Sequence, residues 1–436
     1  MFGVTVAGGL LSLTVELLQL FLPFRFSSIL DITANAAGSA FGYIGYKIVA
    51  RTAYRSLTSA IEKINKGHKV GWLAAMYLLY VACLLLGSWP LQVSSFIAEF
   101  NPSFPLLVGN EPGGTCPWNG SINELLVAKY PFSVQGVEEY LAGRELNTDD
   151  RKDVIAHYTF EGNAPYHDKL NLNPPLEWKG SLSEATDPEE NARIVPDRWL
   201  QTNDAASALS YSIMRTLRYT VCFTVSSKDA KHQHIARMIA VASDPYRQNF
   251  SIVQIRDDLG IRFRSMTTGV NGTNPQFMVN GVFADTMTHR IVVSVSPAQV
   301  RVFVDSLENA YAIELGPGFA MLNKFFPNNG KLSITSPMKN FHRVLFAVVV
   351  FVPLGYLLAL LVNEIQRGVV FRALVACIGI AVPPYLLERM LCYMVGREIS
   401  WANLAIGLAL IFGTLLITLS SKLYSVKSAA AIKEPR

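Results

Sequence analysis

Residues Val344–Val362 read VLFAVVVFVPLGYLLALLV, a run without one charged side chain. A helix needs about 20 mostly apolar residues to cross a bilayer, so this run predicts a membrane span. Other stretches meet the same criterion. Together the predicted spans are Phe2–Leu22, Leu30–Val49, Gly71–Ser88, Val344–Val362, Ala373–Cys392 and Trp401–Ser421. We therefore expect a membrane α-helical bundle of about six spans.

The composition indicates a second, water-exposed part. Of the 436 residues, 50% are hydrophobic and only 16% are charged, whereas a soluble domain has roughly 25% charged residues. Residues 91–342, however, are polar and too numerous for a linker. The net charge of +5 gives no reason to expect nucleic acid as a partner. The sequence contains no Walker or dinucleotide glycine loop, no HExxH and no Cys/His zinc spacing, so we expect no cofactor and no metal.

The distribution of Lys and Arg predicts the orientation, because these residues gather in cytoplasmic loops. The connections after the second and fourth predicted spans and the C-terminal tail hold six, two and four of them. The two short loops on the other side hold one each, Arg25 and Arg397. We therefore expect a multi-pass membrane protein with both termini in the cytoplasm. The predicted parts are N-terminal membrane helices (1–90), an extracytoplasmic domain (91–342), C-terminal membrane helices (343–421) and a basic cytoplasmic tail (422–436).

The first two predicted spans contain polar side chains that lipid does not tolerate alone: Glu16, Gln19, Arg25, Ser28, Asp31 and Asn35. A carboxylate inside a span costs roughly 2.5–3.5 kcal/mol on insertion scales. We therefore expect both carboxylates to face Arg25, with the amides filling the remaining hydrogen bonds. Such a network would open to the outer face of the membrane. It would be either a binding site or only a clamp that fixes helix packing.

The spacing of this motif, from Glu16-Leu-Leu-Gln19 through Arg25, Ser28, Asp31 and Asn35 to Gly38, resembles the signature of the VanZ family. Members are small multi-span bacterial membrane proteins, and the founding member is linked to resistance to the glycopeptide antibiotic teicoplanin. The resemblance covers the first two predicted spans and implies a role in the cell envelope. A complete member has further spans before the motif, whereas this sequence starts with the motif helix.

The last two predicted spans carry a weaker copy of the motif. The intervals that separate Glu16, Arg25, Ser28, Asp31 and Asn35 recur in Glu388, Arg397, Ser400, Asn403 and Gly407. The glutamine is replaced by Leu391, and the aspartate by asparagine. The copy predicts two related halves of three spans each, with both turns outside. The alternative is a chance match, since Arg and Ser are frequent at membrane interfaces.

Residues 101–342 predict β structure, because short alternating runs are separated by Gly, Pro, Asn and Asp turns. These runs are Tyr219–Val225, Arg237–Ala242, Phe250–Arg256, Gly260–Arg264, Arg290–Val295 and Val300–Val304. In Ile261–Arg264 the apolar residues alternate with arginines, which is typical of a half-buried strand. Many short strands without intervening helices indicate a sandwich or jelly roll.

Several of these runs resemble a laminin-G/concanavalin-like jelly roll. Tyr158-Thr-Phe160-Glu with Asp168 resembles the opening strand, Tyr219–Val225 a core strand, and Phe303–Asp305 a strand near the end. Residues Gly109–Ile122 resemble the closing pair, and their position before the opening strand implies a split or permuted sandwich. The resemblance implies glycan recognition.

Five polar residues near the predicted strands are candidates for contacting a glycan: Asn249, Gln254, Arg262, Arg264 and Asn271. The alternative is a merely solvated strand face. Cys116 and Cys222 fall in the same domain, where a disulfide is chemically allowed. Because Cys222 lies in a predicted core strand, a buried free thiol is the competing interpretation.

These observations predict a VanZ-like bacterial membrane protein with a surface-exposed, lectin-like domain, acting in envelope glycan recognition or glycopeptide-antibiotic tolerance. The expected partners are membrane lipid and an envelope glycan or lipid-linked precursor. Two alternatives stay open: a membrane enzyme or transporter acting on such a precursor, and a non-catalytic protein-interaction module. No catalytic residue is assigned, and the sequence leaves the oligomeric state open.

Overall fold

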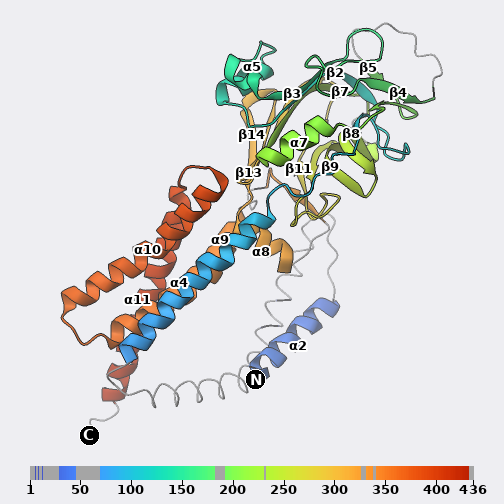
Figure 1. Ribbon diagram of the computed structural model, residues 1–436. Helices are drawn as coiled ribbons and strands as arrows, with labels where there is room; N and C mark the ends of the chain where they lie inside the picture. The colour runs from blue at the N-terminus through green and yellow to red at the C-terminus, as the bar shows by residue number, and fades with distance from the viewer. Residues whose placement is uncertain are drawn as a thin grey trace. The chain divides into compact units, whose positions relative to one another are not determined.

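The computed structural model describes residues 29–45, 69–181, 192–229, 232–325, 330–336 and 340–431, together with Thr5, Gly8 and Ser12. The chain forms two compact units. One comprises Met1–Met76 with Glu364–Gln366, and the other comprises Tyr77–Asn363 with Arg367–Arg436. In the first unit, helix α2 covers Ile29–Gly45. The second unit contains the sheets and most of the long helices (Figure 1).

The polar part of the second unit folds into two sheets. One is eight-stranded in the order β15-β11-β10-β9-β8-β1-β6-β4, and the other is seven-stranded in the order β14-β13-β12-β7-β2-β3, with β5 paired to β2. The strands are β1 Leu106–Val108, β2 Gly120–Ala128, β3 Val154–Thr159, β4 Leu176–Gly180, β5 Ala192–Ile194, β6 Arg198–Thr202, β7 Tyr219–Ser227, β8 His232–Asp244, β9 Arg247–Arg256, β10 Asp258–Phe263, β11 Gln276–Val279, β12 Thr288–Val295, β13 Gln299–Val304, β14 Ser306–Glu314 and β15 Lys331–Ser333.

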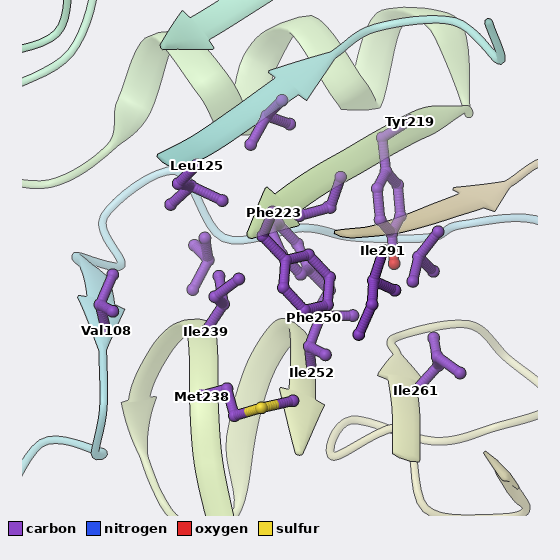
Figure 2. Close-up of a cluster of buried hydrophobic side chains, with 14 of the residues drawn as sticks. Val108, Leu125, Tyr219, Phe223, Met238, Ile239, Phe250, Ile252, Ile261 and Ile291 are labelled. Carbon is purple, nitrogen blue, oxygen red and sulfur yellow. The ribbon is translucent and has the colours of Figure 1, made fainter. Parts of the chain in front are cut away.

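The two sheets share one hydrophobic core, shown in part in Figure 2. Tyr219 and Phe223 of β7 project from the seven-stranded sheet, and Phe250 of β9 projects from the other. The rings of Tyr219 and Phe250 stack with their centroids 4.9 Å apart. Full burial of one large apolar side chain is worth about 1.5–3 kcal/mol. The predicted β-rich domain is thus confirmed as two sheets with a common core, and the six predicted runs coincide with parts of β7, β8, β9, β10, β12 and β13.

Strand β10 departs from the half-buried pattern that the sequence predicted. Residues 259–263 are buried on both faces, and Arg262 is only 5% exposed. A loop that is distant in sequence accounts for this burial. Glu111 forms an ion pair with Arg237 of β8 (3.1 Å), and the N–H of Arg237 donates to the carbonyl of Cys116 (3.0 Å). Both loop residues are close enough to Arg262 to interact with its charge. Alternation along one strand gives no information about a loop that covers its polar face.

Short helices accompany the sheets: α5 Val134–Leu141, α6 Thr148–Lys152, α7 Ser207–Thr216 and α8 Pro317–Phe325. Helix α5 begins at the N-cap Ser133, whose hydroxyl accepts from the N–H of Gly136. Its apolar face packs on Leu126, Cys222 and Val292 of the seven-stranded sheet. This packing places α5 on the sheet face opposite the shared core.

Four described helices are long and apolar enough to cross a membrane. They are α4 Lys69–Ser94, α9 Phe341–Glu364, α10 Val369–Val395 and α11 Trp401–Ala431, whose apolar part ends at Ser420. They contain the third to sixth predicted spans. Most of the first predicted span lies outside the described residues, and the second is helical from Leu30 to Gly45, within α2. The described part of the chain therefore shows four candidate membrane helices rather than six.

Close contacts hold these helices together. The hydroxyl of Tyr77 on α4 donates to the carbonyl of Gly379 on α10 (2.6 Å), and that of Tyr80 donates to Val350 on α9 (3.0 Å). Glycine permits close helix approach: a Cβ added at Gly407 of α11 would lie 3.0 Å from atoms of Phe351 and Pro384.

One end of the helices contacts the sheet domain, and we call it the sheet-facing end. Gln92 near the end of α4 donates from Nε2 to the carbonyls of Pro297 (3.0 Å) and Leu315 (2.9 Å). Arg218, just before β7, donates from Nη2 to the carbonyl of Val395 at the end of α10 (2.9 Å). The turn between α10 and α11 is thereby fixed next to the sheets.

Candidate functional site

A buried carboxylate organises the turn between α10 and α11. Glu388 on α10 is 3% exposed. Its Oε1 accepts from Nη1 of Arg397 (2.5 Å) and from the N–H of Ser400 (2.7 Å), and its Oε2 accepts from Nδ2 of Asn403 (3.3 Å). A carboxylate with three donors is stable in a location where a lone one is not.

The local backbone explains why these residues meet. Helix α10 ends at Val395 and is capped by Gly396 with φ +64°, and the N–H groups of Gly396 and Arg397 both donate to the carbonyl of Cys392. The hydroxyl of Ser400 accepts from the N–H of Asn403 (3.4 Å) at the start of α11. The positive end of a helix dipole also favours a carboxylate there. The turn thus brings Arg397, Ser400 and Asn403 around one side chain of the preceding helix.

This cluster opens onto a pocket with about 70 Å³ of free space. Among the described residues, Oδ1 of Asn403 is buried without a hydrogen-bond partner. An unpaired buried acceptor costs about 1–3 kcal/mol. A donor from water or from a ligand would remove this cost at Asn403. The space is several times what one water needs. Other polar residues at the pocket wall are Gln92, Glu314, His342 and Arg343.

Only part of the hydrogen-bonding capacity of Arg397 is taken up by other described residues. Its side chain is 26% exposed, and all its hydrogen bonds to described residues leave from Nη1, to Glu388 and to the carbonyl of Glu398. Burial alone would lower the pKa of Arg397, but the bond to Glu388 raises it above its ordinary value, so the group stays charged. Nε and Nη2 are therefore available to an anion, which a guanidinium binds through two parallel N–H groups.

The first copy of the motif lies largely beyond what the structure describes. Glu16, Gln19, Arg25 and Ser28 fall outside the described residues, as does the side chain of Asp31. Asn35 of α2 donates from Nδ2 to the hydroxyl of Ser12 (3.0 Å). The network proposed for this copy, and the relation between the two halves, stay predictions.

In the second copy, by contrast, Glu388 is in direct contact with Arg397, Ser400 and Asn403, whereas Gly407 packs against Phe351 and Pro384. Sequence reasoning missed the three wall residues Glu314, His342 and Arg343. Arg343 pairs with Glu314 (3.0 Å), and Nε2 of His342 lies 3.1 Å from the Glu314 carbonyl. The two basic residues directly precede the run Val344–Val362, which was the available signal that they lie at the start of an apolar helix.

The five candidate glycan contacts do not form one open face. Asn249 and Gln254 are fully buried. Oε1 of Gln254 accepts from Nε1 of Trp118 (2.9 Å), and Oδ1 of Asn249 accepts from the N–H of Asn101 (2.7 Å). These two side chains therefore hold internal parts of the sheet domain, and we base no glycan contact on them.

The three remaining candidates also have partners within the chain. Nε of Arg262 donates to Oε1 of Gln276 (2.7 Å). Burial, and secondly the charge of Arg237, lowers the pKa of Arg262 to about 10. Arg264 pairs with Glu99 (3.5 Å), and Oδ1 of Asn271 accepts from Thr273.

The two cysteines of the sheet domain are free. Cys222 on β7 is fully buried, and burial raises the pKa of its thiol well above the ordinary value. The alternative of a buried free thiol is thus the one that the structure shows. Among the described residues, no group of three or more His, Cys, Asp or Glu side chains is arranged to hold a metal ion.

Comparison with known proteins adds one finding. Residues 1–50 match the model of a family described as VanZ/LLP1. No curated protein and no solved structure matches the chain, so the jelly-roll resemblance stays a prediction. A VanZ-like segment at the N-terminus and four apolar helices suggest a VanZ-like membrane protein.

Proposed function

We propose that this is a VanZ-like protein of the bacterial cytoplasmic membrane that binds an anionic, lipid-linked envelope precursor at the sheet-facing end of its helices. The apolar helices and the VanZ/LLP1 match support the membrane location. The excess of Lys and Arg in the other loops supports a cytoplasmic position for both termini, and hence an extracytoplasmic sheet domain.

The observation that carries this proposal is the cluster of Glu388, Arg397 and Asn403 at the edge of apolar helices. Arg397 offers two N–H groups to an anion, and Oδ1 of Asn403 offers an acceptor that lacks a donor. A lipid-linked precursor matches both surroundings, because its phosphate fits the arginine and its chain fits the apolar helix surface. Glu388 acts by holding Arg397 in place.

We further propose that the sheet domain recognises the glycan of the same envelope layer. The support is its position in the chain, between membrane helices and next to the polar cluster, through the contacts of Gln92 and Arg218. Sequestering a precursor, or the glycan made from it, would lower the number of targets available to a glycopeptide antibiotic. We therefore propose that the protein raises tolerance to such an antibiotic.

The binding claim is tested with the full chain in detergent, titrated with a polyprenyl phosphate and followed by native mass spectrometry. Arg397→Ala should weaken binding by about tenfold or more, since a charge-assisted hydrogen bond is worth about 1.5–3 kcal/mol. Arg389→Ala is the matched control, because Arg389 follows Glu388 directly and is exposed. Equal losses in both variants, or equal affinity for the uncharged polyprenol, would refute the site.

The first motif copy is tested in cells. Arg25→Ala and Asp31→Ala, at unchanged protein level, should change sensitivity to teicoplanin if this copy forms a binding network. An unchanged sensitivity, with Arg397→Ala still effective, would restrict the function to the second copy.

A further inference from the structure

The sheet domain has a pocket of about 470 Å³ that sequence analysis did not indicate. It lies on the face of the seven-stranded sheet opposite the shared core, beside α5 and α6. Its wall includes Glu124, Tyr140, Arg144, His157, Leu170 and Arg290. Its volume lies within the range of small-molecule sites, about 300–1,000 Å³.

Strand register brings two wall residues of this pocket, Glu124 and Arg290, to the same face of the sheet. Glu124 on β2 is opposite Thr224 on β7, and Thr224 is opposite Arg290 on β12. Directly paired residues project from the same face of a sheet, so the three form one row across three strands. Their chain neighbours Leu125 and Phe223 point into the shared core instead. The polar row therefore faces outward as a direct result of the alternation.

Hydrogen bonds join the helices beside the pocket to the sheet and to each other. The hydroxyls of Tyr140 on α5 and Thr224 are 3.3 Å apart. The buried carboxylate of Asp150 on α6 accepts from the hydroxyl of Ser133 (2.6 Å) and from Nδ2 of Asn147 (2.6 Å), which joins the two helices. Gly143, at φ +67°, leaves space for the guanidinium of Arg290, which a Cβ would meet at 2.2 Å.

Arg144, Glu145 and Arg151 also line the pocket, and each has an ion-pair partner. Of the other charged wall residues, Arg290 and Glu124 lie on opposite sides of β7. On one side, Nη1 of Arg290 donates to the carbonyl of Leu141 (3.2 Å), and no carboxylate among the described residues lies within ion-pair distance of this guanidinium. On the other side, Nε2 of His157 and Oε1 of Glu124 are 2.7 Å apart. The pocket thus pairs a cation that has no counter-ion with polar groups suited to hydroxyls.

We propose that this pocket binds an acidic sugar unit of the envelope glycan, with the sugar carboxylate on Arg290 and the ring hydroxyls toward Glu124 and His157. This inference rests on the proposed glycan recognition by the sheet domain, and it names the site and the sugar class. A planar carboxylate matches the guanidinium fork, whereas a neutral sugar leaves Arg290 without a counter-ion.

The test is titration calorimetry of the full chain with a disaccharide containing a hexuronic acid, and with the same disaccharide after reduction of its carboxylate to an alcohol. We expect the acidic form to bind at least about tenfold more tightly. Arg290→Gln should remove this preference, and Arg290→Lys should keep part of it. Arg301→Gln is the matched control, since Arg301 is an exposed arginine on the adjacent strand β13.

Three outcomes would overturn this inference: equal binding of the two disaccharides by the unaltered chain, an unchanged preference in Arg290→Gln, or Arg290-dependent binding of glycerol phosphate without binding of the hexuronate. The comparison of disaccharides needs no variant, so it stands even if Arg290→Gln fails to fold. Polyprenyl phosphate binding should be unchanged in Arg290→Gln. A chain that binds polyprenyl phosphate but no hexuronate would therefore contradict this inference alone.

Discussion

At the scale of single residues, Glu388 is the side chain on which the helix turn depends. Its carboxylate accepts from Arg397, Ser400 and Asn403. Removing one partner of a buried pair costs about 3–5 kcal/mol, and the partial exposure of Arg397 reduces this value. Glu388→Ala should therefore lower the midpoint of thermal unfolding, measured by intrinsic fluorescence in detergent. Glu398→Ala, at an exposed position in the same turn, should not. Equal midpoints for the two variants would contradict this role.

Thiol reactivity gives a second prediction for single residues. Burial raises the pKa of both Cys116 and Cys222, so each has less thiolate at pH 8 than an exposed cysteine. Of these two cysteines, Cys116 is partly exposed and Cys222 is buried. Iodoacetamide should therefore label Cys116 slowly, and Cys222 only after denaturation, as read by peptide mass spectrometry. Rapid labelling of native Cys222, or recovery of the pair as a disulfide, would contradict the structure.

Residue spacing predicted much of the polar cluster but not its wall. Glu388, Arg397, Ser400 and Asn403 were found because a repeated interval survives in the sequence. Arg343 and His342 line the same pocket as the cluster because of tertiary packing, which leaves no repeated interval in the sequence. Similarly, Asn249 and Gln254 look like surface polar residues in the sequence, yet internal hydrogen bonds bury them.

At the scale of elements, glycine sets the separation of the helices. A leucine at Gly407 would collide with Phe351 and Pro384, whereas a Cβ added at Gly413 on the same helix would meet no atom within 4 Å. Overpacking costs about 1–3 kcal/mol. Gly407→Leu should therefore lower the unfolding midpoint of the detergent-solubilised chain, while Gly413→Leu should not. The reverse order would mean that α11 packs differently.

Periodicity predicted strand positions well because each run carries its own pattern. The six predicted runs all coincide with strands, and the last four predicted spans all lie in helices. The alternating pattern did not predict that the polar face of β10 is buried, because the loop that covers this face contains Glu111 and Cys116, which are distant in sequence. The pocket beside α5 was missed for the same reason: its row of Glu124, Thr224 and Arg290 exists only through strand pairing.

At the scale of the whole molecule, the central prediction is orientation. One cysteine placed at the exposed Tyr246 of the sheet domain is enough to test it. In a chain whose other cysteines are replaced, Tyr246→Cys should react in intact cells with a maleimide that does not cross membranes. Ser428→Cys in the tail should react only after lysis. The opposite pattern would place the sheet domain in the cytoplasm and remove the basis for glycan recognition.

The most direct test of the proposed function is a cryo-electron microscopy map of the full chain in lipid nanodiscs with a polyprenyl phosphate. Phosphate density should lie within hydrogen-bond distance of Arg397, at about 2.7–2.9 Å, and next to Asn403. A pocket filled only with water, with the phosphate bound elsewhere on the chain, would contradict the account.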